Sequence, residues 1–339
     1  MELKNKKKIL GIIGLLLILV ILYVILESNG WFTSDGNKKI VVESGDGFYK
    51  ITNDLKENDI IGSKIFFKIY AKIFNGNRVN NLKPGELSVS GKISYKKLLD
   101  ELSSVRAKNI SVTIPEGYEL REIANLLVEK KLVNYEKFYD VCKNYDFDYP
   151  YIKELKKTDN RLEGFLFPDT YNFYLNEDNE VTIINTMLKR FDEIYKKYES
   201  DIKKNNLSLY EIVTLASIIE REAMYSDDFY NVSSVFHNRL KRNDNLSYLQ
   251  SCATVQYILK ERKNVLSIAD TKIDSPYNTY KYSGLPVGPI SSPGEFAINA
   301  ALNPGKTDYL YFLNDKDGKL HFSKTYSEHM KLEQKYLGN

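Results

Sequence analysis

Hydrophobic residues recur at helical spacing along much of the chain, and in the stretch Leu209–Ala223 a carboxylate falls among them. Ser208 followed three residues later by Glu211 is a capping-box pattern, so a helix is predicted to begin at Leu209. At about 100° per residue, Glu220 projects onto the apolar face, whereas Glu222 projects to the opposite side. The apolar face comprises Leu209, Ile212, Val213, Ala216, Ile219 and Ala223.

A carboxylate such as Glu220 on an apolar face costs free energy unless it is paired, protonated or used chemically. Burial favours the neutral acid and raises its pKa, which is what a general acid needs near neutral pH. An ion pair with a neighbouring arginine or lysine explains the same position, since structural ion pairs also perturb pKa values. The helix alone therefore leaves both interpretations of Glu220 open.

The longest apolar run is Ile9–Leu26, in which Tyr23 is the only polar-tipped residue. Eighteen residues at about 1.5 Å each reach about 27 Å, enough to cross a thin hydrocarbon core. A cleaved signal peptide is disfavoured because the run is long and Glu27–Gly30 lacks an A-x-A-like site. Four lysines before the run place the N-terminus in the cytoplasm by the positive-inside rule: Lys4, Lys6, Lys7 and Lys8. We therefore predict a cytoplasmic tail (1–8), a transmembrane signal anchor (9–26), a linker (27–38) and an extracytoplasmic remainder on the plasma membrane.

Residues 39–133 alternate short strands and amphipathic helices, and are predicted to form a small α+β module. A strand–turn–helix outline occurs twice, 72 residues apart, which is too few copies for a solenoid. The module either binds glycan or a partner, or acts as a spacer between bilayer and catalytic domain. Its predicted elements are Lys39–Val42, Phe48–Asn58, Ile65–Phe74, Ser94–Leu102, Val112–Ile114 and Leu120–Lys130, with turns at Gly45–Gly47, Leu82–Glu86 and Pro115–Gly117.

Residues 134–339 read as a mainly helical domain with short strands, which makes the whole chain α+β. Leu162–Tyr171 is predicted to be a strand or extended loop that ends at Pro168, and it contains the carboxylate of Glu163. The loops Asp274–Tyr280 and Gly284–Pro293 suit ligand contacts. The predicted helices are Asn134–Lys143, Tyr151–Lys157, Val181–Asn205, Val232–Arg242, Cys252–Leu259, Phe296–Leu302 and Glu328–Tyr336, with strands at Tyr309–Asn314 and Leu320–Ser323.

The amino-acid composition limits the ligands and cofactors that the protein is expected to bind. Lys+Arg 48 against Asp+Glu 45 gives no electrostatic case for nucleic acid. Two cysteines, Cys142 and Cys252, exclude a disulfide framework, although whether they stay free is not decided by their spacing. The three histidines and these cysteines lack metal-ligand spacing, and no glycine-rich phosphate loop is present. We therefore expect no metal and no organic cofactor.

The run LASIIEREA (215–223) resembles the signature of the endolytic murein transglycosylase family (MltG/YceG-like). The N-terminal anchor and TIPEGYEL (113–120) fit as well. One departure is Cys252-Ala253, where many members carry Asp-Pro, which argues against a catalytic role for position 252 and leaves Glu220 unaffected. Further runs follow in the family's order: EGFLFPDTY (163–171), FHNRL (236–240), LQSCATVQY (249–257), DSPYNTY (274–280), GLPVGPISSPG (284–294), ALNPGKTDYLYF (301–312) and HFSKTYSEH (321–329).

The resemblance implies a peptidoglycan-cleaving lytic transglycosylase, with a LysM-like module at 39–133 and a catalytic domain at 134–339. It carries the catalytic glutamate onto Glu220, which the helix projection selects independently. Gln250, Asn278 and Tyr280 are candidate substrate-binding residues. Glu163 and Gln250 are also candidates for stabilising positive charge near the reacting carbon. A role in ending nascent strands beside peptidoglycan synthases follows from the family alone.

Under this hypothesis Glu220 alone serves as acid and then base for cleavage of the MurNAc–GlcNAc β-1,4 bond, giving 1,6-anhydroMurNAc ends. A conventional muramidase would need a second carboxylate, for which Glu163 and Glu222 are candidates. Glu222 is disfavoured because it projects away from the apolar face. A non-catalytic, wall-binding scaffold protein is the alternative from another class, and it predicts binding without cleavage.

Overall fold

Packing in the computed structural model divides the chain into two compact units. The N-terminal unit comprises residues 1–110 and 172–178, and the C-terminal unit comprises 111–171 and 179–339. The predicted boundary after residue 133 is therefore too late, because the segment from Ser111 packs with the C-terminal unit. The residues that the structure describes are 2–33, 35–42, 46–74, 85–104, 109–174, 179–223, 225–263 and 265–338.

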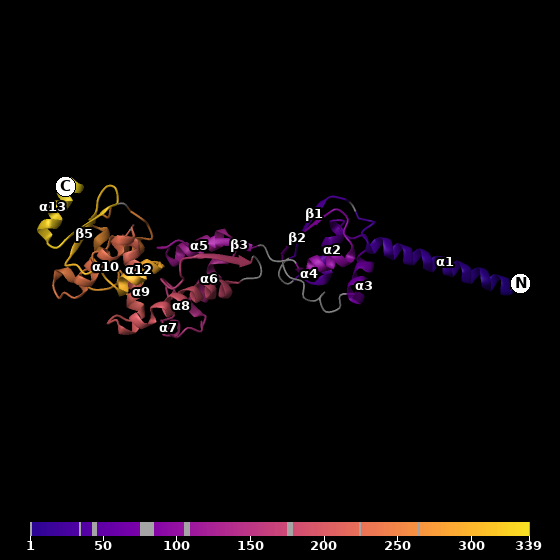
Figure 1. Ribbon diagram of the computed structural model, residues 1–339, viewed down its shortest axis with the longest axis horizontal. Coiled ribbons are helices and arrows are strands. Elements are labelled where there is room, and N and C mark those ends of the chain that lie inside the picture. The colour runs from indigo at the N-terminus through magenta and orange to yellow at the C-terminus, as the bar shows by residue number, and fades with distance from the viewer. Residues whose placement is uncertain are drawn as a thin grey trace. The chain divides into compact units, whose positions relative to one another are not determined.

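Helix α1 (Glu2–Ser28) contains the whole predicted span and continues past it (Figure 1). Its part from Gly11 to Ser28 has a mean hydropathy of 2.6 and is only 6% buried, which is compatible with a single membrane-spanning helix. The predicted linker from residue 27 is wrong at its start. Glu27 is still helical and buried, and its carboxylate accepts hydrogen bonds from the Ser63 backbone N–H (2.6 Å) and from the Tyr95 hydroxyl.

The N-terminal unit is built on an antiparallel pair of strands, β1 (Asn37–Val42) and β2 (Gly85–Ser90), in which Ile40 lies opposite Leu87. Strand β2 was not predicted, and Leu82–Pro84 of the predicted turn, like Gly45, lie outside the described residues. One apolar core joins the sheet to the helices. These helices are α2 (Phe48–Glu57), α3 (Lys64–Phe74) and α4 (Tyr95–Ser104).

The C-terminal unit is mainly helical, as predicted, with short strands in two-stranded pairs. Strand β5 (Tyr311–Asn314) pairs antiparallel with β6 (Leu320–Ser323), and β3 (Asn109–Thr113), which belongs to this unit from Ser111 on, pairs with β4 (Thr170–Tyr174), which belongs to it up to Tyr171. Its helices are α5 (Leu120–Glu129), α6 (Tyr135–Asn144), α7 (Pro150–Lys153), α8 (Glu180–Lys204), α9 (Leu209–Glu222), α10 (Ser226–Leu240), α11 (Cys252–Leu259), α12 (Glu295–Leu302) and α13 (Tyr326–Tyr336).

The stretch predicted as a strand before Pro168 is instead a run of buried turns. The Phe165 N–H donates to the Leu162 carbonyl at 3.1 Å, which is a local turn rather than a ladder bond. Beside it, the buried Arg161 guanidinium donates to the backbone carbonyls of Lys143, Tyr145 and Ile152. The Arg161 bonds satisfy carbonyls at the end of α6 and in α7, and so connect these segments to the turns.

Helix α9 lies at the centre of the C-terminal unit, and Figure 1 shows α10 and α12 beside it. Its predicted start is confirmed, since Ser208 and Glu211 form the reciprocal capping box. The prediction of a single apolar face is wrong, because every residue from Ile212 to Ile219 is buried. The buried hydroxyls of Thr214 and Ser217 each donate a hydrogen bond to a backbone carbonyl of the preceding turn. Helix α9 is thus a core helix, with carboxylates only near its ends.

Candidate active site

Glu220 lies in the last turn of α9 and is partly exposed. Its Oε2 accepts a hydrogen bond of 2.9 Å from the backbone N–H of Gly294, the residue that caps the N-terminus of α12. No hydrogen bond or ion pair holds its Oε1 within the described part of the chain. The neighbouring Arg221 instead pairs with Glu119 at 3.4 Å, so the ion-pair interpretation of Glu220 is wrong.

The surroundings of Glu220 favour its neutral form. Burial raises its pKa to about 7, the Gly294 hydrogen bond opposes that rise, and the nearby charge of Glu116 adds to it. Its position at the carboxyl end of a helix acts in the same direction, since the helix dipole is negative there. A carboxyl group with a pKa near 7 can both give and take a proton at neutral pH.

The second carboxylate at this site belongs to Glu116, which the sequence did not single out. A Cβ placed on Gly294 would overlap Glu116 Oε1, while the N–H of the same glycine binds Glu220. From these contacts and standard backbone geometry, the two carboxylates lie within roughly 8 Å of each other. Partial burial raises the pKa of Glu116. Its position in a Pro-Glu-Gly turn directly after a strand was the signal available in the sequence.

Two backbone hydrogen bonds hold the Glu116 turn over α9. The Gly117 N–H donates to the Ser292 carbonyl at 2.9 Å, and the Ser292 N–H donates to the Tyr118 carbonyl at 2.7 Å. Gly117 has φ +75°, and a Cβ there would lie 3.6 Å from Glu220 Cγ. Glycine suits this position because the backbone is left-handed, whereas the contact of a Cβ with Glu220 would be an ordinary van der Waals one.

The segment around Ser292 is fastened to α9 in turn. Ser217 Oγ accepts a hydrogen bond of 3.0 Å from the Ile290 N–H, and the Ser291 hydroxyl donates to the Ser217 carbonyl at 3.1 Å. Because both serines are buried, these bonds fix the backbone that presents the Gly294 N–H to Glu220. Three segments that are far apart in the sequence thus form one site: the Glu116 turn, helix α9 and the segment from Ile290 to Gly294.

Glu163 is buried elsewhere in the C-terminal unit, with 3% of its surface exposed. Its Oε1 accepts from the Leu120 N–H at 2.9 Å, the first residue of α5, and its Oε2 accepts from the Tyr257 hydroxyl at 3.0 Å. Burial raises the pKa of Glu163 to about 8 against these hydrogen bonds. Both of its oxygens are therefore used by the protein, unlike those of Glu220.

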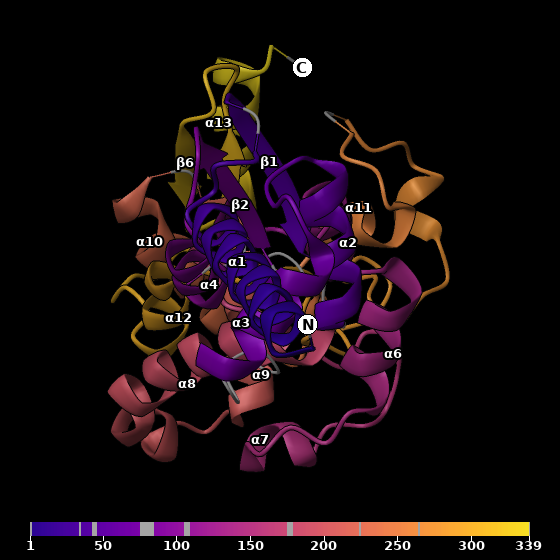
Figure 2. The ribbon, with the colours of Figure 1, turned by 90° about the vertical axis from the view of Figure 1, so that its right-hand side faces the viewer.

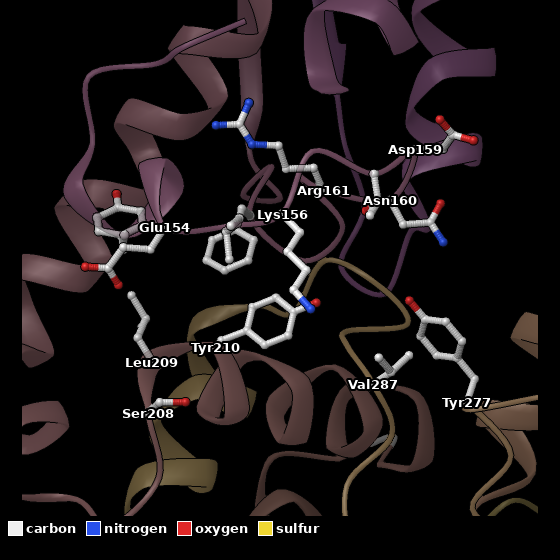
Figure 3. Close-up of a pocket in the computed structure, with 14 residues that line it drawn as sticks. Glu154, Lys156, Asp159, Asn160, Arg161, Ser208, Leu209, Tyr210, Tyr277 and Val287 are labelled. Carbon is white, nitrogen blue, oxygen red and sulfur yellow. The ribbon is translucent and has the colours of Figure 1, made fainter. Parts of the chain in front are cut away.

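Two adjoining cavities, of about 1030 Å³ and about 800 Å³, lie on this side of the unit and share Asp159, Asn160 and Tyr277 in their walls. Glu163 and Tyr257 line the larger one, and Glu220 lines neither. Figure 3 shows the smaller cavity, with the side chains of Lys156 and Tyr210 pointing toward one another inside it. In the same view the Arg161 guanidinium points away from Tyr210, consistent with its bonds to backbone carbonyls.

Gln250 and Tyr280 come together beside the N-terminus of α11. Gln250 is exposed with φ +53°, and its N–H donates to the Thr279 carbonyl at 3.1 Å. The Tyr280 hydroxyl lies 3.1 Å from Cys252 Sγ, and Cys252 and Cys142 are both free. Glu222 belongs to this cluster, since its Oε1 accepts from the Ser251 hydroxyl at 2.5 Å and burial raises its pKa.

Asn278 is completely buried and its side chain organises a loop. It donates to the carbonyls of Thr271 (3.0 Å) and Ile273 (2.7 Å) and accepts from the Tyr280 N–H (3.0 Å). These bonds occupy both donors and the acceptor of the amide.

The predicted site residues thus lie in three separate places: Glu220 at the end of α9, Glu163 beside the start of α5, and Gln250, Asn278 and Tyr280 near the start of α11. Within the described residues, Glu163, Gln250, Asn278 and Tyr280 form no hydrogen bond or ion pair with Glu220. The same residues contain no group of three His, Cys, Asp or Glu side chains arranged to hold a metal ion. The carboxylate that does join Glu220 is Glu116.

Two neighbouring carboxyl groups, one with a pKa near neutrality, are the groups that enzymes use to cleave glycosidic bonds. The chain belongs to the YceG-like family, whose sequence pattern matches residues 40–335. It is 34% identical over 315 residues to the endolytic murein transglycosylase of Bacillus subtilis, covering 88% of this chain and 85% of that protein. The protein of the same name from Streptococcus pneumoniae is 32% identical over 327 residues, and this chain covers 58% of its length.

A crystal structure of a protein described as YceG-like, from Listeria monocytogenes, has a similar fold. The two align with a TM-score of 0.60 at 33% sequence identity, covering 88% of this chain and all of the other. The sequence resemblance to this family is therefore confirmed.

Proposed function

We propose that this protein is a membrane-anchored endolytic transglycosylase that cleaves the MurNAc–GlcNAc β-1,4 bond within nascent peptidoglycan strands. The names of the relatives support the reaction class and the polymer. The observation that carries the assignment of Glu220 is its asymmetry: Gly294 holds Oε2, while Oε1 has no hydrogen-bond partner in the described chain and the pKa is about 7.

In the first step, protonated Glu220 gives its proton to the glycosidic oxygen through Oε1 as the bond to C1 of MurNAc breaks. The Gly294 N–H bond keeps the carboxyl plane fixed and stabilises the carboxylate that forms. Positive charge develops at C1, and the Glu116 carboxylate, whose charge already acts on Glu220, could stabilise it.

In the second step, the Glu220 carboxylate takes the proton from the C6 hydroxyl of the same MurNAc as its oxygen attacks C1. A 1,6-anhydroMurNAc end forms, the proton returns to Glu220, and no water is consumed. One carboxyl group therefore completes the cycle, which its near-neutral pKa permits.

Glu116 also supports a second candidate, a conventional muramidase. A separation within roughly 8 Å covers the spacing of both retaining and inverting glycosidases. In that reaction Glu116 would act as nucleophile or activate water. The two candidates give different sugar ends, so product analysis separates them.

The same proposal assigns roles to the N-terminal regions and to the other predicted site residues. The part of the predicted LysM-like module (39–133) that packs in the N-terminal unit, residues 39–110, is proposed to form that module. Helix α1 anchors the chain with its N-terminus in the cytoplasm, and peptidoglycan synthases are neighbours at the bilayer. Gln250 and Tyr280, which are exposed or partly exposed, contact substrate. Glu163 and Asn278, whose polar atoms are all bonded internally, position loops around it.

Digestion of peptidoglycan by the full-length protein, followed by mass spectrometry of the products, tests the proposal. We expect anhydroMurNAc ends from the wild type, almost none from Glu220→Gln, and undiminished cleavage by Glu211→Gln, the matched control on the same helix, in which glutamine can keep the capping box. Reducing MurNAc ends would replace the transglycosylase by the muramidase. Glycan binding without cleavage by the wild type would favour the non-catalytic scaffold.

A further inference from the structure

Helix α3 presents two different surfaces. Phe67 and Ala71 are fully buried in the N-terminal unit. On the opposite side Ile65, Ile69 and Ile73 follow one another at i, i+4 and i+8, with 69%, 49% and 66% of their surfaces exposed. Three such isoleucines in a row form a continuous apolar stripe, which a water-facing helix rarely keeps.

A row of lysines runs beside this stripe, at Lys64, Lys68 and Lys72. No carboxylate among the described residues lies within ion-pair distance of any of them. Lys64 donates to the Asn53 side-chain amide oxygen at 2.8 Å, and Lys68 lies 3.9 Å from the centre of the Tyr49 ring, so the partners of these two lysines are neutral groups. An apolar face flanked by lysines is typical of helices that lie in a membrane interface.

The position of α3 relative to α1 indicates the depth at which α3 would lie in the membrane. The Phe66 ring lies 5.3 Å from the Tyr23 ring, and Tyr23 belongs to the apolar part of α1, three residues before its end at Leu26. Figures 1 and 2 both show α3 beside α1. If α1 spans the bilayer, α3 therefore lies at the depth of the outer headgroups.

Hydrogen bonds connect the end of α1 to the start of α3 and to α4. Buried Glu27, one residue after that apolar part, accepts hydrogen bonds from the Ser63 N–H before α3 and from the Tyr95 hydroxyl. Nearby, Phe32 stacks on Tyr23 at 5.1 Å, and Trp31 is 63% exposed. Aromatic residues of this kind concentrate at membrane interfaces.

We propose that the Ile65–Ile69–Ile73 face of α3 rests in the outer leaflet of the bilayer that α1 spans, with the lysine row on its lipid headgroups. This inference rests on the membrane anchoring of the proposed function. It gives the N-terminal unit a fixed orientation on the membrane instead of free rotation about a tether.

Tryptophan quenching in the full-length protein, reconstituted into vesicles, tests this surface. Trp31 is the only tryptophan, so Trp31→Phe gives a background into which single tryptophans are placed. Ile69→Trp is expected to emit at shorter wavelength than a water-exposed tryptophan. It should lose most of its fluorescence to lipids brominated near the headgroup, more strongly in vesicles with phosphatidylglycerol than in neutral ones. Val41→Trp, on exposed β1, is the matched control and should keep its fluorescence.

Leu19→Trp in α1 separates this proposal from the anchor itself. Quenching of Leu19→Trp by deeply brominated lipid, with no quenching of Ile69→Trp, would overturn the α3 contact and leave the anchor intact. Loss of quenching at both positions would overturn the anchor. Equal quenching of Ile69→Trp and Val41→Trp would also contradict the proposal, because the contact would not be specific to α3.

Discussion

Glu220 and Glu163 are both carboxyl groups with raised pKa values, about 7 and about 8, yet their surroundings differ. Glu163 is buried, and a backbone N–H and a tyrosine hydroxyl use both of its oxygens. Glu220 is partly exposed, has one oxygen bound by the protein and has a second carboxylate beside it. Of these two acids with raised pKa values, only Glu220 keeps a carboxyl oxygen without a partner in the described chain, and for that reason the proposed mechanism assigns the acid to Glu220 rather than to Glu163.

If Glu220 and Glu163 differ in this way, the largest expected effect is the loss of catalytic activity in the variant Glu220→Gln. Removing the acid should lower the cleavage rate by about 10²–10⁴-fold, because the amide cannot give or take the proton. The melting temperature should change little, since the amide oxygen can still accept from Gly294. Glu163→Gln, assayed in parallel by release of soluble glycan, should keep most of its activity. A larger loss in Glu163→Gln than in Glu220→Gln would reverse the assignment.

A smaller effect is expected on stability when Glu163 becomes leucine. The Leu120 N–H and the Tyr257 hydroxyl would be left buried without an acceptor, which costs about 1–3 kcal/mol in the free energy of unfolding. Denaturant unfolding of Glu163→Leu against Glu163→Gln measures this, since glutamine keeps an acceptor of similar shape. Equal stability of the two variants would show that these hydrogen bonds contribute nothing.

The pH dependence of stability should also distinguish the two carboxyl groups. Burial raises the pKa of Glu163 from 4.5 to about 8, so between these values the folded state holds a proton that the unfolded state releases. Its contribution to stability is therefore present at low pH and is lost as pH rises from about 5 to about 8, with a slope of at most about 1.4 kcal/mol per pH unit. Unfolding curves at several pH values should be flatter in Glu163→Gln; an unchanged slope would contradict the raised pKa.

The smallest effect concerns Glu116→Gln. Its negative charge helps to raise the pKa of Glu220, so its removal should move the alkaline limb of the activity profile to lower pH, by less than about one unit. Anhydro products should persist in the transglycosylase, although at a lower rate, because the negative charge that could stabilise C1 is also lost. Complete loss of cleavage, with reducing ends in the wild type, would instead identify Glu116 as the second carboxylate of a hydrolase.

Sequence alone determined the elements that depend on local pattern. The capping box predicted the start of α9 at Leu209, the apolar run predicted the part of α1 from Ile9 to Leu26, and helix α11 begins and ends as predicted. These features depend on residues within a few positions of each other, so the nearest neighbours are sufficient to specify them.

Only the tertiary structure decided which carboxylates meet. Glu116, Glu220 and Gly294 are far apart in the chain, and their contact depends on the Gly117–Ser292 backbone bonds and on the packing of α9 against α12. The sequence likewise did not predict that α9 is buried on all sides, because a helical projection shows the polarity of each face but not what packs against it. Sequence therefore proposed Glu220 from the pattern of its own helix, whereas the neighbouring position of Glu116 depends on long-range contacts that no local pattern encodes.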